Sequence, residues 1–480
     1  MKTYIKLMLF LLTGIIIVSA NAEFTYDPEK GILTDGIWTL KGTLVAGSTQ
    51  NLAVSGAEGS FDGDKDKTYS IDLTEIYDSD RQRYFAVSYK AFSANKGEYN
   101  PAKEEGSNLY PYRGNLREFI APDCKSISES GCFLDCVNLE KVQLSEQFSS
   151  FDKHRPFQNC SKLKTFSPRE LNISKIPIQC FSGCSSLTGE FVFPKCSGHN
   201  GGGQWFQGCS KLESVKMPCM KVIEASAFAS CSNLKYVEFS EDLEKISTGA
   251  FNGCSSLPGD VIRTLLHPGI ERLGSNETDV KNIFMNCSSF DGALEWNFKD
   301  LTSTNVVGIN YFSGCTRLSQ IVFKTYVYEI RGSSLLNLAP GAEIYMHSEP
   351  VKVFEGNSVG NSKGPFIKLY IDDQSMDDWM EVIDKTYHVF YKKDFNNESW
   401  TESVFDKNNN IYTRDRNVMI TRMKEDDQIC ALDSGSNKIR LNQNGVVAFC
   451  MRETTGSKTS DLPCFWVMKT PPKGFKVIVR

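Results

Sequence analysis

The sequence predicts a repeat solenoid, a stack of short units that each supply one parallel β-strand, flanked by β-rich terminal domains. Three observations support this fold class. The seven-residue pattern F-x-x-C-x-x-L recurs through the middle of the 480-residue chain. Each copy leads into a short alternating run, and an aliphatic residue precedes the phenylalanine. Because no unit of this kind can bury its own apolar face, the units must stack and share one core.

The repeated pattern is marked by a cysteine at its centre. The eight copies, of which the last two are degraded or displaced, carry Cys136, Cys160, Cys184, Cys209, Cys231, Cys254, Cys287 and Cys315. Successive cysteines are 24, 24, 25, 22, 23, 33 and 28 residues apart, and chance does not place eight of sixteen cysteines in this way. The 33-residue interval is expected to hold an insertion from Pro268 that forms a loop on one rim.

The residues after each copy alternate as a half-buried strand does. Clear cases are LEKVQL from Leu139, LESVKMP from Leu212, LKYVEF from Leu234 and LSQIVF from Leu318. A further anchor stands five residues before the phenylalanine, at Ile176, Ile223, Ile246 and Val307. One unit is therefore a strand, a turn, a buried aliphatic residue, a second turn and a buried Phe-Cys segment. Leu257 is expected to enter the next strand in the same way.

This pattern resembles the leucine-rich repeats, and specifically the BspA-like (Treponema-type) subfamily. That type places A-F-x-x-C before L-x-x-L-x-L, as ASAFASCSNLKYVEF does from Ala225. The more general consensus has Asn or Cys after the strand, and this chain departs from that form. The resemblance implies a leucine-rich-repeat horseshoe over residues 111–345. It also implies a non-enzymatic role in adhesion or host interaction, through protein or glycan binding.

The N-terminus resembles a secretory signal peptide over residues 1–22. Lys2 and Lys6 precede an apolar run from Leu7 to Val18, and Ala20-Asn21-Ala22 supplies a small-x-small cleavage pattern. Twelve apolar residues are too few to span a bilayer comfortably, and no later segment reaches 18. We therefore expect an extracellular or outer cell-surface protein with no membrane span in its mature chain.

The two ends of the array differ from its middle. Residues 23–110 are rich in Gly and β-branched residues and are expected to form a β-rich module or cap, with NLREFIAP from Asn115 as a weak first rung. Residues 346–385 are expected to cap the array with a closing strand and a short helix from Pro365. Residues 386–480 are expected to form a separate small β domain, whose final GFKVIVR could belong to a C-terminal sorting domain.

The repeated cysteines are expected to be reduced and buried. Neighbouring strands lie about 4.8 Å apart, within the Cα range of a disulfide, but in-phase side chains run parallel and keep their Cβ atoms too far apart. Zinc is the alternative, because Cys132/Cys136 and Cys180/Cys184 have ligand-like spacing. The five histidines are scattered, which disfavours it. One disulfide among Cys430, Cys450 and Cys464 would leave a free thiol.

Other chemistry has little support in the sequence. No G-x-S-x-G motif is present, and no catalytic residue, metal or cofactor is expected. DGDKDK from Asp62 and DKNNN from Asp406 lack the Gly and Glu of a calcium loop and favour polar turns. HNGGGQW from His199 is expected to connect rungs. The net charge of −5 gives no reason to expect nucleic acid as a partner, because there is no basic excess to neutralise phosphates.

What remains is the outward face of the strands. The residues on either side of each central aliphatic residue should point away from the core. The candidate binding row is Lys141, Gln143, Ser214, Lys216, Tyr236, Glu238 and Gln320. Thr165, Ser167 and Val322 occupy the same phase. Plain solvated β surface is the competing interpretation of this row.

The function predicted is a secreted or cell-surface protein that binds a protein or glycan partner without catalysis. An alternative is a carbohydrate-handling protein whose active or sugar-binding part lies in residues 386–480. A third is a spacer whose outward row contacts nothing. The pattern names neither the ligand nor the oligomeric state.

Overall fold

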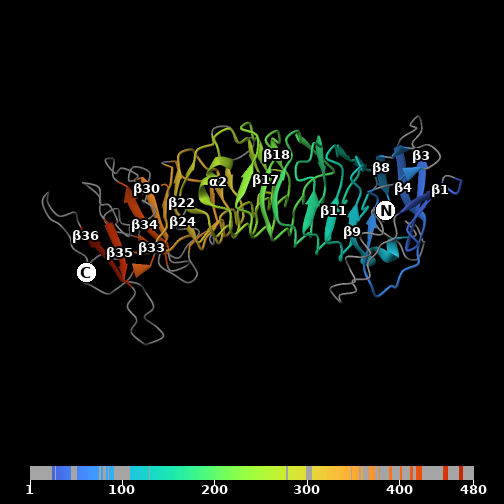
Figure 1. Ribbon diagram of the computed structural model, residues 1–480. Helices are drawn as coiled ribbons and strands as arrows, with labels where there is room; N and C mark the ends of the chain where they lie inside the picture. Colours follow the sequence, from blue (N-terminus) through green and yellow to red (C-terminus); the bar gives the residue numbers. More distant parts are fainter. Residues whose placement is uncertain are drawn as a thin grey trace, which may run out of the picture.

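The computed structural model describes residues 24–90, 109–298 and 305–372 with internal gaps. Beyond residue 372 it describes residue 378 and short strands. The chain forms an elongated stack of rungs, running from β9 near one end to β30 near the other (Figure 1). The expected signal peptide, residues 1–22, lies outside the described residues.

One face of the stack is a parallel sheet, which we call the main sheet. It has three parts, because the strand ladder is broken at two places. At the first break, a single parallel bridge between Glu170 and Val192 still joins the two rungs. The first part is β5 (Tyr69–Asp72), β9 (Leu116–Ile120), β11 (Lys141–Gln143) and β13 (Thr165–Ser167). The second is β15 (Gly189–Val192), β17 (Leu212–Lys216) and β19 (Tyr236–Glu238). The third begins with β22 (Asp291–Trp296), β24 (Arg317–Phe323), β27 (Glu343–Tyr345) and β30 (Ile367–Asp372).

The main sheet extends past both expected ends of the array. β5 pairs in parallel with β9, so NLREFIAP is the second strand of the sheet and not the first. β30 pairs in parallel with β34 (Val418–Met423), so the strand expected to close the array does not end the sheet. β33 (Ile411–Thr413), β31 (Val389–Tyr391) and β32 (Thr401–Glu402) follow in that sheet. The boundaries at residues 110, 345 and 385 stay a proposal.

The N-terminal strands form a mixed sheet. β1 (Thr25–Asp27), β2 (Ile32–Thr34), β3 (Trp38–Leu44) and β4 (Asn51–Phe61) pair antiparallel. β8 (Ala86–Lys90), β10 (Ser126–Ile127) and β12 (Ser150–Phe151) continue it in parallel. The β-rich module thus joins the array through this second line of pairing. The short hairpins are β6 (Tyr77–Asp78) with β7 (Arg83–Tyr84), and β35 (Val447–Met451) with β36 (Cys464–Met468).

The aliphatic anchors form short parallel strands of their own. Ile176, Ile223, Ile246 and Val307 are fully buried, as predicted. Their strands, with the neighbours that pair with them, are β14 (Lys175–Pro177), β16 (Gly198–Asn200), β18 (Val222–Ile223), β20 (Lys245–Ile246), β21 (Arg272–Leu273), β23 (Val306–Val307), β25 (Glu329–Ile330) and β28 (Val353–Phe354). HNGGGQW therefore begins inside β16, paired with β14, and is not only a connector.

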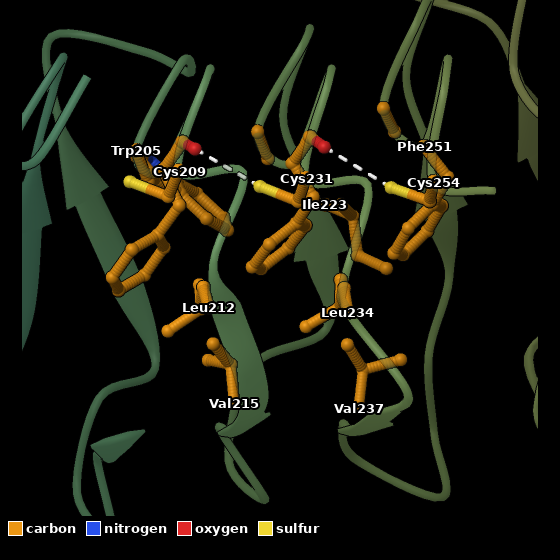
Figure 2. Close-up of a cluster of buried hydrophobic side chains, with 14 of the residues drawn as sticks. Trp205, Cys209, Leu212, Val215, Ile223, Cys231, Leu234, Val237, Phe251 and Cys254 are labelled. Atoms are coloured by element: carbon orange, nitrogen blue, oxygen red, sulfur yellow. Dashed lines mark hydrogen bonds between the residues drawn. The ribbon is translucent and has the colours of Figure 1, made fainter. Parts of the chain in front are cut away.

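The phenylalanines of the repeats form a continuous column in the core. From Phe133 to Phe312 successive rings stack with centroids 4.9–6.1 Å apart and planes within 13° of parallel. Leu and Val residues of the main strands lie in rows beneath this column, as Leu212, Leu234, Val215 and Val237 do in Figure 2. Burial of these rows from one rung to the next supplies the stability that no single unit has.

The rung of Cys254 departs from the predicted unit. Leu257 is buried but leads into the helix α2 (Gly259–Leu265), so the prediction of a strand there is wrong. Asp260 in the first turn favours the helix start, because a carboxylate is stabilised at the N-terminal end of a helix.

The segment after Pro268, expected to hold the insertion, first supplies β21, which pairs with β20. Leu273 stands 11 residues before Phe284, whereas Ile246 stands 5 before Phe251, so six of the extra residues of the 33-residue interval follow β21, inside the segment where the insertion is expected. The stretch that holds α2 takes the other four, since Leu273 follows Cys254 by 19 residues and Ile246 follows Cys231 by 15.

Two further rungs follow Cys315. The backbone N–H of Phe312 donates to the carbonyl of Ser334, as that of Phe251 does to Ile283, which places Leu335 at the phenylalanine position. Leu335 lies in β26 (Leu335–Leu336), which pairs with β29 (Val359–Gly360). Sequence reasoning missed these rungs because Leu and Val replace the Phe there, and Leu338 stands at the Cys position.

Candidate binding surface

The eight repeated cysteines, which we call the cysteine ladder, are fully buried and keep free thiols, as predicted. From the second copy onward each thiol donates a hydrogen bond to the carbonyl of the preceding rung's phenylalanine, two cases of which Figure 2 shows. The Sγ to oxygen distances are 3.0–3.3 Å. The thiols therefore fasten each rung to its neighbour.

Burial also removes the reactivity of these thiols. It raises the pKa of Cys254 well above its ordinary value, and it raises the pKa values of Cys231 and Cys287 in the same direction. A neutral, buried thiol is a poor nucleophile, because the thiolate is the reactive form. The ladder accounts for the cysteine motif structurally.

The zinc-like cysteine pairs lie inside the core. Cys132, Cys136, Cys180 and Cys184 are all fully buried. Among the described residues, no group of three or more His, Cys, Asp or Glu side chains is arranged to hold a metal ion. The turn from Asp62 is closed by Asp64, whose carboxylate accepts the Asp66 N–H at 3.0 Å. Asp406 and the three C-terminal cysteines lie where the structure describes no side chains.

The outward row of the main sheet divides into two parts. Lys141, Gln143, Ser214, Lys216 and Glu238 are partly exposed, and Tyr236 is 43% exposed. They lie on β11, β17 and β19, where Ser214 pairs with Tyr236 and Lys216 pairs with Glu238.

Gln320 does not belong to an exposed row. Its side chain is 1% exposed and Val322 is 3% exposed, although both stand at outward positions of β24. Glu343, beside Gln320 on β27, is also buried, so the outward face is covered at this end of the sheet. Strand phase alone cannot reveal such a cover.

Five outward side chains in the middle of the array form what we call the central cluster: Glu190, Ser214, Lys216, Tyr236 and Glu238. The Lys216 ammonium lies 3.0 Å from Glu190 Oε2, and the Ser214 hydroxyl donates to the same oxygen at 3.0 Å. The ammonium also lies 6.0 Å from the centre of the Tyr236 ring, whose hydroxyl donates to Glu238 at 3.5 Å. The cluster spans β15, β17 and β19.

The charges of the central cluster support one another. The hydrogen bond from Lys216 lowers the pKa of Glu190, and the same bond raises the pKa of Lys216. Both groups therefore stay ionised at neutral pH. Exposed ion pairs contribute little to stability, so the cluster is better suited to present donors, acceptors and an aromatic ring than to hold the fold together.

The sequence pattern did not predict Glu190 as a member of the outward row. It follows Gly189, whose φ of 80° accompanies a register shift that aligns Phe191 with Val215. An alignment of GEFVFP on its apolar residues, with the glycine counted as an inserted position, would have placed Glu190 in the outward row. Gly292 makes the corresponding shift before Leu294 on β22.

The sequence matches the BspA type leucine rich repeat region, in six copies. The matched segments are residues 104–216, 197–263 and 277–362, which together cover about half of the chain. They include the rung of Leu335 and both strands that carry the Lys216–Tyr236 contact. Among the described residues, no helix has the length and apolar character that crossing a bilayer requires.

Solved structures with the same kind of repeat are similar to this chain. The leucine-rich repeat protein of T. pallidum is 21% identical, with a TM-score of 0.35, over 50% of this chain and 96% of that chain. A leucine-rich cell surface protein of Faecalibacterium prausnitzii is 15% identical, with a TM-score of 0.35, over 69% and 93% of the two chains. A leucine-rich repeat protein of Bacteroides ovatus is 16% identical, with a TM-score of 0.31, over 72% and 97%. No curated protein matches the sequence.

Proposed function

Since the chain belongs to the BspA type leucine-rich repeat family, we propose that it is a non-enzymatic binding protein that holds a protein or glycan partner on its central cluster. The repeat array supplies an extended face of parallel strands, and solenoids use such surfaces for recognition. The basic n-region, apolar run and small-x-small pattern of residues 1–22 support export, so we place this binding at the cell surface or outside the cell.

One observation carries this proposal: an exposed tyrosine lies beside a fixed ion pair in the middle of the array. Tyr236 is the aromatic member of the large apolar side chains that are exposed among the described residues. Tyrosine is enriched in binding hot spots because it supplies contact area at little conformational cost. Lys216 and Glu190 add a hydrogen-bond donor and an acceptor next to the ring.

The test is binding by the full chain to extracellular matrix proteins and to a glycan array. A Lys216→Ala/Tyr236→Ala variant is compared with a Lys141→Ala/Thr165→Ala variant, which changes outward residues of the first part of the sheet. We expect the first variant to lose at least ten-fold in affinity, by analogy with hot-spot residues, and the second to bind as the unmodified protein does. Equal binding by both variants would show that the central cluster does not hold the partner.

A second measurement tests the absence of catalysis. The full chain is incubated with polysaccharides, and the release of reducing ends is followed. We expect no release above that of a heat-unfolded sample. Turnover would instead support the carbohydrate-handling alternative.

A further inference from the structure

Helix α2 interrupts the main sheet beside the central cluster. It stands where the Cys254 rung would supply a strand, and it leaves β19 as the last strand of the β15–β17–β19 sheet. β22 is the first strand of the next part. The interruption therefore creates two strand edges that face the same helix-bearing rung.

The two strand edges differ in whether a side chain of α2 covers them. Arg263 of α2 donates to the carbonyl oxygens of Asp291 at 2.7 Å and Ala293 at 3.3 Å, so its guanidinium covers the edge of β22. On the β19 side, no hydrogen bond among the described residues joins α2 to the main chain of the strand. Natural proteins block exposed edges because an open edge accepts another strand.

The main chain of Val237 faces the side of β19 that has no neighbouring strand. Glu238 accepts a hydrogen bond from the N–H of Met217, so its carbonyl points toward β17. Backbone groups of successive strand residues point to opposite sides, and the N–H and C=O of Val237 therefore point toward α2. Val237 pairs with Val215 in the register of β17 and β19 but has no strand partner on its other side in the described residues.

A groove of about 750 Å³ runs along this open edge, between β19 and α2. Its lining includes the carboxylates Glu238, Glu241, Asp242 and Asp260, and no Lys or Arg. Glu241, Asp242 and Asp260 are exposed. Lys221 approaches Asp242 at 3.8 Å but is held more closely by Glu244 at 3.0 Å. The groove is therefore strongly acidic, with Val261 and Leu265 of α2 as its apolar wall.

We propose that this groove binds an extended basic peptide segment of a partner protein, which adds to β19 as a further strand. The Val237 N–H and C=O would hydrogen-bond the peptide main chain, and the four carboxylates would pair with its Lys or Arg side chains. The inference rests on the proposed function, because Tyr236 and Glu238 belong both to the central cluster and to the groove lining. It names the partner at that site as a protein with an exposed basic strand.

The test uses a labelled peptide of about seven alternating lysine and threonine residues, titrated with the full chain. The same peptide methylated on alternate backbone nitrogens keeps every charge but loses the N–H donors of one strand edge, where the methyl groups also block close approach to β19. We expect the methylated form to bind about ten-fold more weakly, as the loss of one or two hydrogen bonds implies. Equal affinity of the two forms would overturn strand addition, and no binding of the unmodified peptide would overturn the proposal entirely.

A matched pair of variants tests the acidic lining. Glu241→Gln/Asp242→Asn/Asp260→Asn should weaken peptide binding at least ten-fold and abolish most of its salt dependence. Glu146→Gln/Asp123→Asn/Asp152→Asn is the control, because it also removes three exposed carboxylates. Its Glu146 follows Ser145 as Glu241 follows Ser240, on a rung whose strand β11 is paired on both sides. Unchanged binding by the groove variant would contradict the proposal.

Two readouts separate this inference from the proposed function and from self-association. The Lys216→Ala/Tyr236→Ala variant tests the function through its protein or glycan ligand, so a loss there with no peptide binding would refute only the groove. Hydrogen exchange at the Val237 amide should slow at least ten-fold on peptide binding, while that of Glu238, directed toward β17, should not change. Protection that rises with protein concentration and without peptide would instead assign the edge to a second copy of the chain.

Discussion

The Sγ atom of Cys254 lies 3.1 Å from the carbonyl oxygen of Phe228, to which its thiol donates a hydrogen bond across one rung. The same relationship joins Cys231 to Phe206 and Cys287 to Phe251. The Phe and the Cys of the repeat are thus coupled: the ring packs in the column while its carbonyl receives the next thiol. This coupling explains why the two residues recur at fixed spacing.

Removal of this thiol should destabilise the array. Cys254→Ala leaves a small cavity and deprives the Phe228 carbonyl of a donor, so we expect a loss of about 1–3 kcal/mol in the free energy of unfolding. Cys219→Ala is the control, because Cys219 is exposed, and it should stay within about 0.5 kcal/mol. Urea unfolding followed by circular dichroism measures both. If the two variants lose the same free energy of unfolding, the cysteine ladder does not stabilise the array.

The ladder also predicts a loss of stability in alkali. Burial raises the pKa of Cys254 above the value near 9.0 of an unfolded thiol, so the native state keeps a proton that the unfolded state releases. The free energy of unfolding should therefore fall as pH rises above about 9, by up to about 1.4 kcal/mol per pH unit for this thiol. Because Cys254→Ala lacks the group, its difference from the unmodified protein should shrink between pH 7 and 10. A constant difference would contradict the shift.

The residue before each ladder cysteine has a left-handed backbone, which predicts a graded response at Gly253. Its φ is 78°, and Asn159 and Asn286 occupy the same position at 63° and 60°. Gly253→Ala should cost about 1 kcal/mol or more, whereas Gly253→Asn should cost less, since Asn tolerates this region better. Thermal unfolding of the two variants measures the order, and a more stable Ala variant would contradict it.

The capping of β22 by Arg263 predicts a specific loss. Arg263→Ala leaves the carbonyls of Asp291 and Ala293 without this donor and should cost about 1–3 kcal/mol. Arg317→Ala is the matched control, because the ion pair that Arg317 forms among the described residues is with the exposed Asp291 carboxylate, at 3.3 Å. Its loss should cost under about 1 kcal/mol. Chemical unfolding compares them. A larger loss for Arg317→Ala would show that the edge needs no cap.

Much of the fold could be predicted because the residues that define the repeat pattern are those buried in the core. Phe251, Cys254 and Ile246 are fully buried, and the equivalent residues of neighbouring rungs occupy the same buried positions. The same residue types are therefore required in each repeat. The left-handed backbone position before each ladder cysteine is also visible in the sequence, since Gly, Asn, Asp or Ser occupies it in every copy.

Other features of the fold and of the candidate site could not be predicted, because they depend on substitutions or contacts that the repeat pattern does not show. Leu335 fills the place of a phenylalanine because burial requires only an apolar side chain of suitable size. Residues 259–265 form a helix where the array calls for a strand, since α2 buries Val261 and Ile262 equally well. The burial of Gln320 and the grouping of Glu190 with Lys216 depend on contacts between rungs, which strand phase within one rung does not contain.

The central claim is that the repeated cysteines pack the core and that binding belongs to the surface. Native-state thiol labelling, followed peptide by peptide with mass spectrometry, tests it most directly. Among the cysteines whose side chains the structure describes, Cys219 should label within minutes, and Cys254 and the rest of the ladder should label only on unfolding. Rapid labelling of Cys254 in the folded protein, or its recovery in a disulfide with Cys231, would contradict the account.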